Sequence, residues 1–399
     1  SMFCFFCLLF LFITLGLFFY KKRITIAFLF SLEWTILVIL IFVMDMPIEP
    51  WAYIFVFLCM FFFSLSSFLN FRVIPKVSSD DLFEKTITKY SKYIFYINLI
   101  ATLYLGYKLG FSSITFSSIS QLSERMNVIS SMRYTGEEDY LPLFNRVVNS
   151  LVYATLGFDG LVMAQKTNLR RFNNLILINV QTFLTNTKAT LVFGIAFWIA
   201  GYLTGYNYYD KRIKIKDVFI LLLSSIGLIT IVVLINYLRH RGIYSLYEEL
   251  NTILVAYLIG PFSAFSIWFQ NFHLNELGLG ENTFSCIFRI LGLKEQSHGE
   301  FVIINGQLTN VYTVFKHLII DYSYFGTIIV MAVIGFIANI IDAYVISNNR
   351  KAVGFSISIV SFILVSFFSS IFRYTTNIVA IFIIIAFPFV LNLRSFRNE

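Results

Sequence analysis

The stretch TNVYTVFKHLIIDYSYFG, Thr309–Gly326, leads directly into a long apolar segment. It carries many hydrogen-bonding and titratable side chains for the entrance of such a segment, including Asn310, Lys316, His317 and Asp321. A helix that only crosses lipid gains nothing from these groups, because polar side chains are costly to bury in hydrocarbon. The stretch therefore predicts a membrane helix whose first residues have a role besides crossing the lipid.

The composition of the whole chain supports a membrane location. Of 399 residues, 58% are hydrophobic and 19% are aromatic, and the mean hydropathy is +0.78. A soluble domain of this size needs a more polar surface. Apolar runs of spanning length recur from end to end, which predicts an all-α polytopic membrane protein. The first run, 2–20, is followed by Lys21-Lys22-Arg23 and has no cleavage site, so it is interpreted as a membrane anchor.

The apolar runs predict a single integral membrane domain over residues 1–399 with about eleven transmembrane helices. The predicted spans are 2–20, 24–44, 51–70, 90–109, 142–164, 173–186, 189–206, 217–237, 318–345, 353–372 and 375–392. With the N-terminus outside, most of the 30 lysines and arginines fall in inner loops, as the positive-inside rule requires. The net charge of +8 is then an orientation signal, and no nucleic-acid partner is expected.

This topology leaves two long segments outside, 110–141 and 238–311. The second contains the apolar run 251–270, which is long enough to span. A span there would place Arg350 and Lys351 on the outer side, against the charge rule. We expect re-entrant or interfacial helices instead, broken at Gly260-Pro261. The hairpin 173–206 is the other ambiguous part of the topology, because its turn is short.

Outer loops need no arginines for orientation, yet these contain Arg125, Arg133, Arg239, Arg241 and Arg289. The planar guanidinium group suits phosphate oxygens. The alternative is that the arginines pair with acidic residues, because the segment 238–311 also holds six glutamates. Arg239 and Arg241 are the stronger candidates, since they lie where a helix leaves the membrane.

Other chemistry is weakly indicated. The acidic residues 137–139 are interpreted as solvated, and the four histidines lack metal-ligand spacing, so no metal site is predicted. No nucleotide-binding glycine loop is present. Some charged residues fall within predicted spans and are expected to face the bundle interior or a cleft: Glu33, Arg146, Asp159, Lys188 and Asp342.

The stretch 309–326 resembles the signature of the O-antigen polymerases (Wzy), within the wider group of oligosaccharide repeat-unit polymerases. The positions that match are Asn310, Tyr312, Thr313, Phe315, Asp321 and Gly326, while Ser323 stands where a glycine is common. Arg125 and Gly136, with ten residues between them, match a feature of the first large loop of this family. In the second loop the corresponding pair, Arg289 and Gly299, is one residue closer. GLGENTF, 278–284, precedes the closing signature.

The resemblance implies a glycosyltransferase architecture of the GT-C-like membrane type, with 110–141 and 238–311 as two large periplasmic loops. Such an enzyme transfers a growing glycan from undecaprenyl pyrophosphate onto a lipid-linked repeat unit, as in lipopolysaccharide biosynthesis. It implies an inverting reaction without metal or other cofactor, at the periplasmic face of the bacterial inner membrane. Membrane lipids and a chain-length regulator protein are the implied partners.

The resemblance and the chemistry together nominate site residues. Displacing a lipid pyrophosphate requires stabilisation of the developing negative charge, the role expected of the five outer arginines. The acceptor hydroxyl needs a base, for which the candidates are Asp321, His317 and Glu248. His317 and Asp321 are four residues apart and would share a helix face, either as catalytic groups or as a structural pair. Asn310, Tyr312 and Thr313 are expected to orient sugar hydroxyls or to brace the loop.

Two other functions remain open. A flippase or transporter of lipid-linked oligosaccharide would explain the many spans and intramembrane charges, although no internal repeat is visible. An O-antigen ligase would share the fold. Ligases resemble this stretch but carry a histidine immediately before the conserved asparagine, where this chain has Thr309.

Overall fold

A computed structural model gives the fold of most of the chain. It describes residues 2–46, 48–69, 71, 73, 81–111, 121, 124–129, 132, 141–185, 187–211, 227, 230, 232–234, 237, 245–273, 276–294, 301–304 and 307–395. The chain divides into two compact units. Unit 1 comprises Ser1–Val77 and Leu254–Ile378, and unit 2 comprises Ser78–Ile253 and Val379–Glu399.

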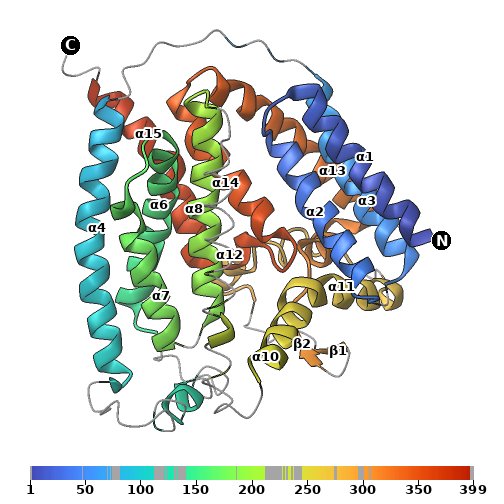
Figure 1. The fold of residues 1–399 in the computed structure, drawn as a ribbon, viewed down its shortest axis with the longest axis horizontal. Helices are drawn as coiled ribbons and strands as arrows, with labels where there is room; N and C mark the ends of the chain where they lie inside the picture. Colours follow the sequence, from blue (N-terminus) through green and yellow to red (C-terminus); the bar gives the residue numbers. More distant parts are fainter. Residues whose placement is uncertain are drawn as a thin grey trace. The chain divides into compact units, whose positions relative to one another are not determined.

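The prediction of an all-α membrane protein is confirmed, with one short β-hairpin added (Figure 1). The elements of unit 1 are α1 (Met2–Lys21), α2 (Ile26–Val43), α3 (Pro50–Leu65), η1 (Ser66–Phe68), η5 (Leu254–Ile259), α11 (Gly260–Asn271), α12 (Ser285–Ile290), β1 (Val302–Ile304), β2 (Gln307–Thr309), α13 (Val314–Ile346), α14 (Arg350–Ser366) and η6 (Ile371–Arg373). Those of unit 2 are α4 (Asp81–Lys108), α6 (Leu143–Gln165), η4 (Leu169–Phe172), α7 (Asn173–Thr185), α8 (Lys188–Tyr208), α10 (Leu246–Ile253) and most of α15 (Thr375–Ser395).

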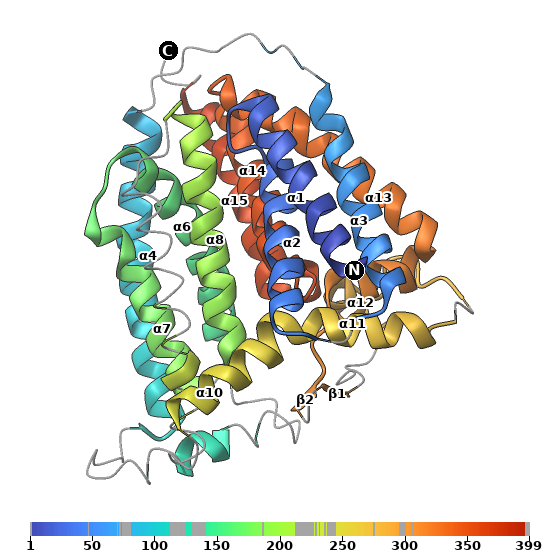
Figure 2. The same cartoon turned by 45° about the vertical axis from the view of Figure 1, so that its right-hand side comes forward.

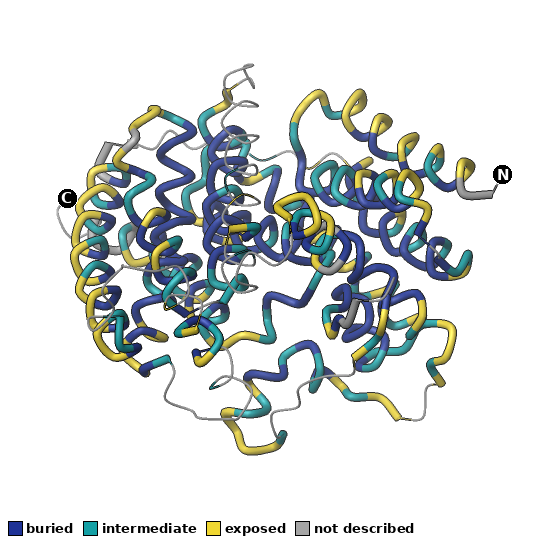
Figure 3. The backbone as a smooth tube through the Cα atoms, turned by 60° about the horizontal axis from the view of Figure 1, so that its bottom comes forward, coloured by how far each residue is buried: buried dark blue, intermediate teal, exposed yellow. Residues whose placement is uncertain are grey.

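Within the described residues, 7 helical segments are long and apolar enough to cross a membrane, and 375–391 is a shorter apolar helix. The chain is therefore a multi-pass membrane protein. The predicted count of eleven stays a prediction, because most of 217–237 lies outside the described residues and α7 has only 13 residues. Large apolar side chains stay exposed along α1, where the tube near the N-terminus is largely yellow (Figure 3). Lipid contact explains this surface, because water would disfavour it.

Hydrogen bonds define the two ends of unit 1. At one end, Lys21 donates to the carbonyl of Leu69 (3.5 Å), and Asn339 near the end of α13 donates to the same carbonyl (3.1 Å). There the Asp342 carboxylate also accepts from the backbone N–H of Ile26 (2.7 Å), which caps the first turn of α2. The turns 22–25, 66–69 and 347–349 therefore share one end of unit 1, which carries Lys21–Arg23, Arg350 and Lys351 from the predicted inner basic residues.

The opposite end of unit 1 holds α11, which runs across the ends of α1, α2 and α3 instead of along them (Figure 2). Ser266 of α11 accepts from the backbone N–H of Glu49, the residue before α3 (2.7 Å). Phe265 of α11 lies against Phe55 of α3 and Phe315 of α13, with ring centroids 6.4 and 6.2 Å apart. The re-entrant or interfacial placement of 251–270 stays a prediction, because the helical segment 246–271 is also long and apolar enough to cross a membrane.

The expected break at Gly260-Pro261 differs in form. The backbone is helical throughout 246–271, and the irregularity is a π-helical turn, η5, directly before Gly260. A proline ring collides with the carbonyl of the preceding turn in a regular α-helix. A wider turn before Pro261 relieves this collision, so the helix continues.

Unit 2 is built on close contact between α6 and α8. The sequence GYLTG, 201–205, places two glycines one helical turn apart on α8. A Cβ added at Gly201 would lie 1.8 Å from the carbonyl oxygen of Gly157, and one at Gly160 would lie 2.1 Å from that of Trp198. These glycines let the two backbones touch, the usual packing of membrane helices.

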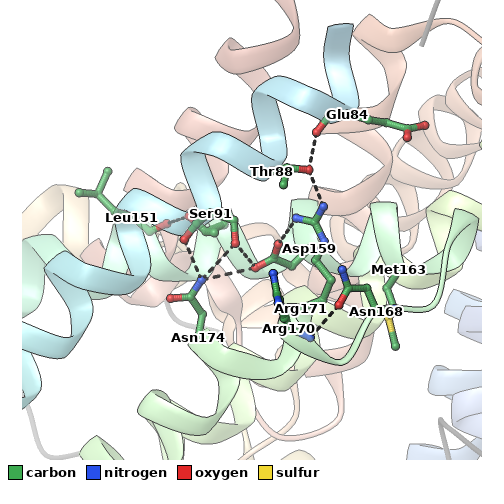
Figure 4. Close-up of polar contacts among 11 residues, drawn as sticks. Glu84, Thr88, Ser91, Leu151, Asp159, Met163, Asn168, Arg170, Arg171 and Asn174 are labelled. Carbon is green, nitrogen blue, oxygen red and sulfur yellow. Dashed lines mark hydrogen bonds and ion pairs between the residues drawn. The ribbon is translucent and has the colours of Figure 1, made fainter. Parts of the chain in front are cut away.

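A buried charge network joins the other helices of unit 2 (Figure 4). Asp159 of α6 accepts from Arg171 of η4 (3.0 Å) and from Ser91 of α4 (2.8 Å). Arg171 also donates to Thr88 of α4 (2.6 Å), and Asn174 of α7 donates to Asp159 (3.4 Å). All of these groups except Thr88 are buried, so a pair of opposite charges replaces the lone charge that lipid would penalise.

The predictions for the charged residues within predicted spans thus differ in outcome. The prediction of an interior position is confirmed for Asp159 and Asp342, and the carboxylate oxygens of Glu33 are also buried. Arg146 is exposed and donates to the carbonyl of Leu141 (3.0 Å), so it does not lie in the interior, and a cleft position for it stays a prediction. It lies in the first turn of α6, from which its side chain reaches back beyond the start of the helix. Lys188 is half-buried at the start of α8.

A candidate anion-binding site at the entrance of α13

Most of the stretch Thr309–Gly326 forms a short arm at the start of helix α13. Ser323 has φ 67° and ψ 176°, which interrupts the helix and kinks it. Residues 314–322 form a short arm before the kink, and 324–346 form the long apolar helix. This backbone conformation is essentially restricted to glycine. The sequence resemblance also expects glycine here, so the local structure and the resemblance agree at this position.

The short arm is bound to the GLGENTF loop through Asp321. Its carboxylate accepts from the backbone N–H and side-chain amide of Asn282 (3.0 and 2.9 Å). It also accepts from the backbone N–H and hydroxyl of Thr283 (both 2.6 Å). Asp321 is fully buried. Four donor groups occupy a carboxylate that offers about four lone-pair positions, so the arrangement favours a positioning role over proton transfer.

Glycine at 278 is required for this contact. A Cβ at Gly278 would lie 2.4 Å from Oδ1 of Asp321 and 2.8 Å from the amide nitrogen of Asn282. The backbone N–H groups of Gly278 and Leu279 donate to the carbonyls of Ile320 and Asp321 (3.0 and 3.1 Å). The two segments quoted for the resemblance, 278–284 and 309–326, therefore come together in unit 1.

A row of basic side chains lies beside this clamp. Arg373 of η6 is 3.0 Å from His317 of the short arm, measured from Nη1 to Nε2. Arg289 of α12 donates from Nη2 to the backbone carbonyl of Arg373 (3.0 Å) and from Nε to that of Ser285 (3.3 Å). Because arginine only donates, His317 accepts through Nε2, and its remaining proton is assigned to Nδ1.

Two lysines extend the row. Lys316 lies over the ring of Tyr312, 3.5 Å from its centroid, and 5.5 Å from that of Trp268. Lys294 contacts Glu281 (3.1 Å) and the side-chain oxygen of Asn282 (2.9 Å). We call Arg289, Lys294, Lys316, His317 and Arg373 the basic cluster.

The electrostatics of the basic cluster favour an anion. Arg373, Lys316 and Lys294 all lie close enough to act on His317. Burial lowers the pKa of Arg373, Tyr374 raises it, and the charge of Arg289 lowers it further. Among the described residues, neither arginine pairs with a carboxylate. Two guanidinium groups without carboxylate partners provide the forked donors that phosphate oxygens accept.

The predicted phosphate-binding arginines have different positions. Arg289 lies in the basic cluster. Arg125 lies in unit 2, where its Nε donates to the carbonyl of Leu109 at the end of α4 (2.6 Å), a helix C-terminal contact. Arg133, Arg239 and Arg241 lie outside the described residues, as do the acidic residues 137–139.

The other nominated residues are placed as follows. Glu248 is exposed in unit 2 and accepts from the backbone N–H of Ser245 (2.7 Å) at the start of α10, while Ser245 Oγ accepts from the N–H of Glu248. Thr313 is the residue before α13 and is buried, Tyr312 holds the lysine described above, and Asn310 is exposed. His317 contacts Arg373 and Asp321 contacts the 282–283 backbone, so each has its own partner.

Sequence reasoning missed Arg373 and Lys294 and gave Lys316 no role. Arg373 had a usable signal. It lies in the two-residue outer turn between the predicted spans 353–372 and 375–392, where a basic residue is unexpected for orientation. Lys294 had none, because it is one of many charges in a long loop.

The fold and this site define an all-α, multi-pass membrane protein with a basic cluster at one helix entrance. Comparison with known protein families, with curated proteins and with solved structures finds no match.

Proposed function

We propose that this protein is a membrane glycosyltransferase that polymerises lipid-linked oligosaccharide repeat units. Its donor is a growing glycan on undecaprenyl pyrophosphate, and its acceptor is the terminal sugar of one lipid-linked repeat unit. The proposal includes placement in a bacterial inner membrane, with the basic cluster facing the periplasm. The observation that carries it is that Arg289 and Arg373 lie together beside the segment 309–326 and have no carboxylate partner among the described residues.

The chemistry assigned to the cluster is leaving-group stabilisation. The acceptor hydroxyl oxygen attacks the anomeric carbon of the donor sugar, the bond from that carbon to the pyrophosphate oxygen breaks, and the hydroxyl proton passes to the departing pyrophosphate. The bonding electrons remain on the pyrophosphate, whose added negative charge the two guanidinium groups stabilise. His317 holds Arg373 through its Nε2 (3.0 Å), and Asp321 fixes the arm that carries His317. Both are positioning residues in this proposal.

The position of the cluster in unit 1 supports its orientation. The basic turn 21–23 and the start of α14 lie at one end of the unit, whereas α11 and the entrance of α13 lie at the other. If the first end follows the positive-inside rule, the basic cluster lies at the outer surface. A lipid-linked pyrophosphate that has crossed the membrane would be found there.

The test is a reaction with purified protein and lipid-linked repeat units, without nucleotide and with a chelator present. Arg373→Ala or Arg289→Ala should each lower the rate about a hundredfold, the usual effect of removing one donor to a developing charge. Arg170→Ala, at an exposed arginine of unit 2, is the matched control and should leave the rate unchanged. A ladder formed by Arg373→Ala at the wild-type rate would refute the proposed role.

The same reaction separates the alternatives. A flippase would move lipid-linked units across vesicles and form no longer glycan. A ligase would consume a lipid A core or another finished acceptor and form no ladder on undecaprenyl pyrophosphate. In cells, a polymerase defect leaves one repeat on the finished acceptor, whereas a flippase defect delivers none.

A further inference from the structure

A second candidate site lies in unit 1, where the end of α11 meets the start of α3. It is a surface pocket of about 190 Å³ lined by Glu49, Trp51, Phe269 and Gln270. Glu49 and Trp51 lie at the start of α3, and Phe269 and Gln270 lie in the last turns of α11. Trp51 is 69% exposed, although it is one of the largest apolar side chains of the chain.

The polar groups of this pocket are unused by the fold. The Glu49 carboxylate, the Trp51 indole and the Gln270 amide have no hydrogen-bond or ion-pair partner among the described residues. Trp51 and Gln270 are exposed and Glu49 is half-buried, so water satisfies their polar groups in the free protein. A carboxylate, an amide and an indole N–H that share one hollow are therefore available to a ligand that replaces this water.

The walls of the pocket are held in place. Ser266 of α11 accepts from the backbone N–H of Glu49 (2.7 Å), which ties α11 to the start of α3. The ring of Phe269 packs against Phe55 of α3 and Tyr324 of α13, with centroids 5.4 and 5.1 Å apart. A rigid pocket loses less entropy when it binds a ligand than a mobile one.

We propose that Glu49, Trp51, Phe269 and Gln270 form a subsite for one sugar ring of the glycan carried by the lipid-linked substrate. A sugar ring presents hydroxyl groups at its edge and an apolar face of C–H groups. The carboxylate and amide accept and donate to the hydroxyls, and the aromatic rings cover the apolar face. This inference rests on the proposed function for the source of the glycan.

The pocket wall also contacts the arm that carries the basic cluster. Phe55, which packs on Phe269, also packs on Phe315, with centroids 6.0 Å apart. Phe315 directly precedes Lys316 of the cluster, so the pocket wall and the cluster rest on the same aromatic core of unit 1.

An exposed tryptophan at a helix end is also what a membrane interface selects. An interfacial anchor alone requires no carboxylate and no amide beside it. It also predicts that removing Trp51 leaves glycan binding unchanged, so the two roles differ in a measurable way.

The test measures binding of free glycan to purified protein by saturation-transfer NMR and by titration. The probe is the oligosaccharide released by mild acid from the lipid-linked glycans of the host membrane, and it carries no lipid and no phosphate. Trp51→Ala should weaken binding about tenfold and Gln270→Ala about threefold. Trp51→Phe should retain most of the affinity.

Phe325→Ala, at a 73% exposed aromatic residue of α13, is the matched control and should bind as wild type does. Unchanged melting temperatures show that the variants fold. Wild-type binding by Trp51→Ala, or no binding by the wild-type protein, would overturn the subsite.

Arg373→Ala should bind this phosphate-free probe with the affinity of the wild type. Glycan binding without polymerase activity would therefore count against the proposed function and not against the pocket.

Discussion

At the residue scale, the structure reverses the roles that the sequence suggests for Asp321 and Arg373. It favours a structural role for Asp321 and a functional one for Arg373. Asp321 stands out as an acid at a membrane helix entrance, yet four donor groups hold its carboxylate in a fully buried position. Arg373 looks like a turn residue between two spans, yet it contacts His317 and Arg289. The spacing of polar residues along 309–326 predicts functional side chains in this stretch. It does not predict which distant segments supply the partners, because those contacts come from residues 282–294 and 373.

The positioning role of Asp321 has a specific consequence. Asp321→Asn replaces one acceptor oxygen by a donor that faces the N–H groups of Asn282 and Thr283. Loss of a charge-assisted hydrogen bond and the new donor clash should destabilise the protein by about 3 kcal/mol. The melting temperature in detergent should fall together with activity. Thr283→Val, which removes one donor, should have a smaller effect in the same direction.

A catalytic base would behave differently. In that case Asp321→Asn would lower kcat, alter the pH profile of the reaction and leave the melting temperature unchanged. That pattern would contradict the positioning role.

At the scale of single elements, α13 shows why the predicted span boundary differed from the helix boundary. The apolar pattern predicts a span over 318–345, whereas the helix begins at Val314 and kinks at Ser323. A kink that depends on one backbone conformation leaves no trace in hydropathy. The sequence did contain a hint, since Ser323 occupies a position where the resemblance expects glycine. For 251–270 the sequence predicted an irregularity at Gly260-Pro261, but not that it takes the form of a π-helical turn before these residues.

Ser323 should be under strain that glycine would relieve. Ser323→Gly removes a cost of about 1–3 kcal/mol for the unusual backbone angles. It also loses the hydrogen bond from the N–H of Gly326 to Ser323 Oγ (3.2 Å), at a cost of about 1 kcal/mol. The net expectation is a modest rise in melting temperature. Ser323→Ala keeps the strain and loses the bond, so it should melt below the wild type. The reverse order, with alanine above glycine, would exclude strain at this kink.

At the scale of the whole molecule, composition and charge distribution predicted the class of protein correctly. The all-α, multi-pass character follows from apolar runs that only helices can satisfy in lipid. In unit 1 the hydrogen bonds of Lys21, Asn339 and Asp342 place the basic turns at one end, as the charge rule predicts. The division into two units was not predicted, because it depends on contacts between residues far apart in the chain, such as Phe83 and Phe387 in unit 2. The close contact between α6 and α8 at their glycines was also not predicted, because it depends on which helices pack together.

The central claim is that the basic cluster binds the pyrophosphate of a lipid carrier. The most direct measurement is the dissociation constant of undecaprenyl pyrophosphate for the protein in lipid nanodiscs, with undecaprenol as the phosphate-free comparison. Arg289→Ala and Arg373→Ala should each weaken binding of the pyrophosphate at least about tenfold, as expected for loss of a hydrogen bond to a charged group. Arg170→Ala should have no effect, and undecaprenol should bind all variants alike. Equal affinity of the wild type and both arginine variants for the pyrophosphate would contradict the claim.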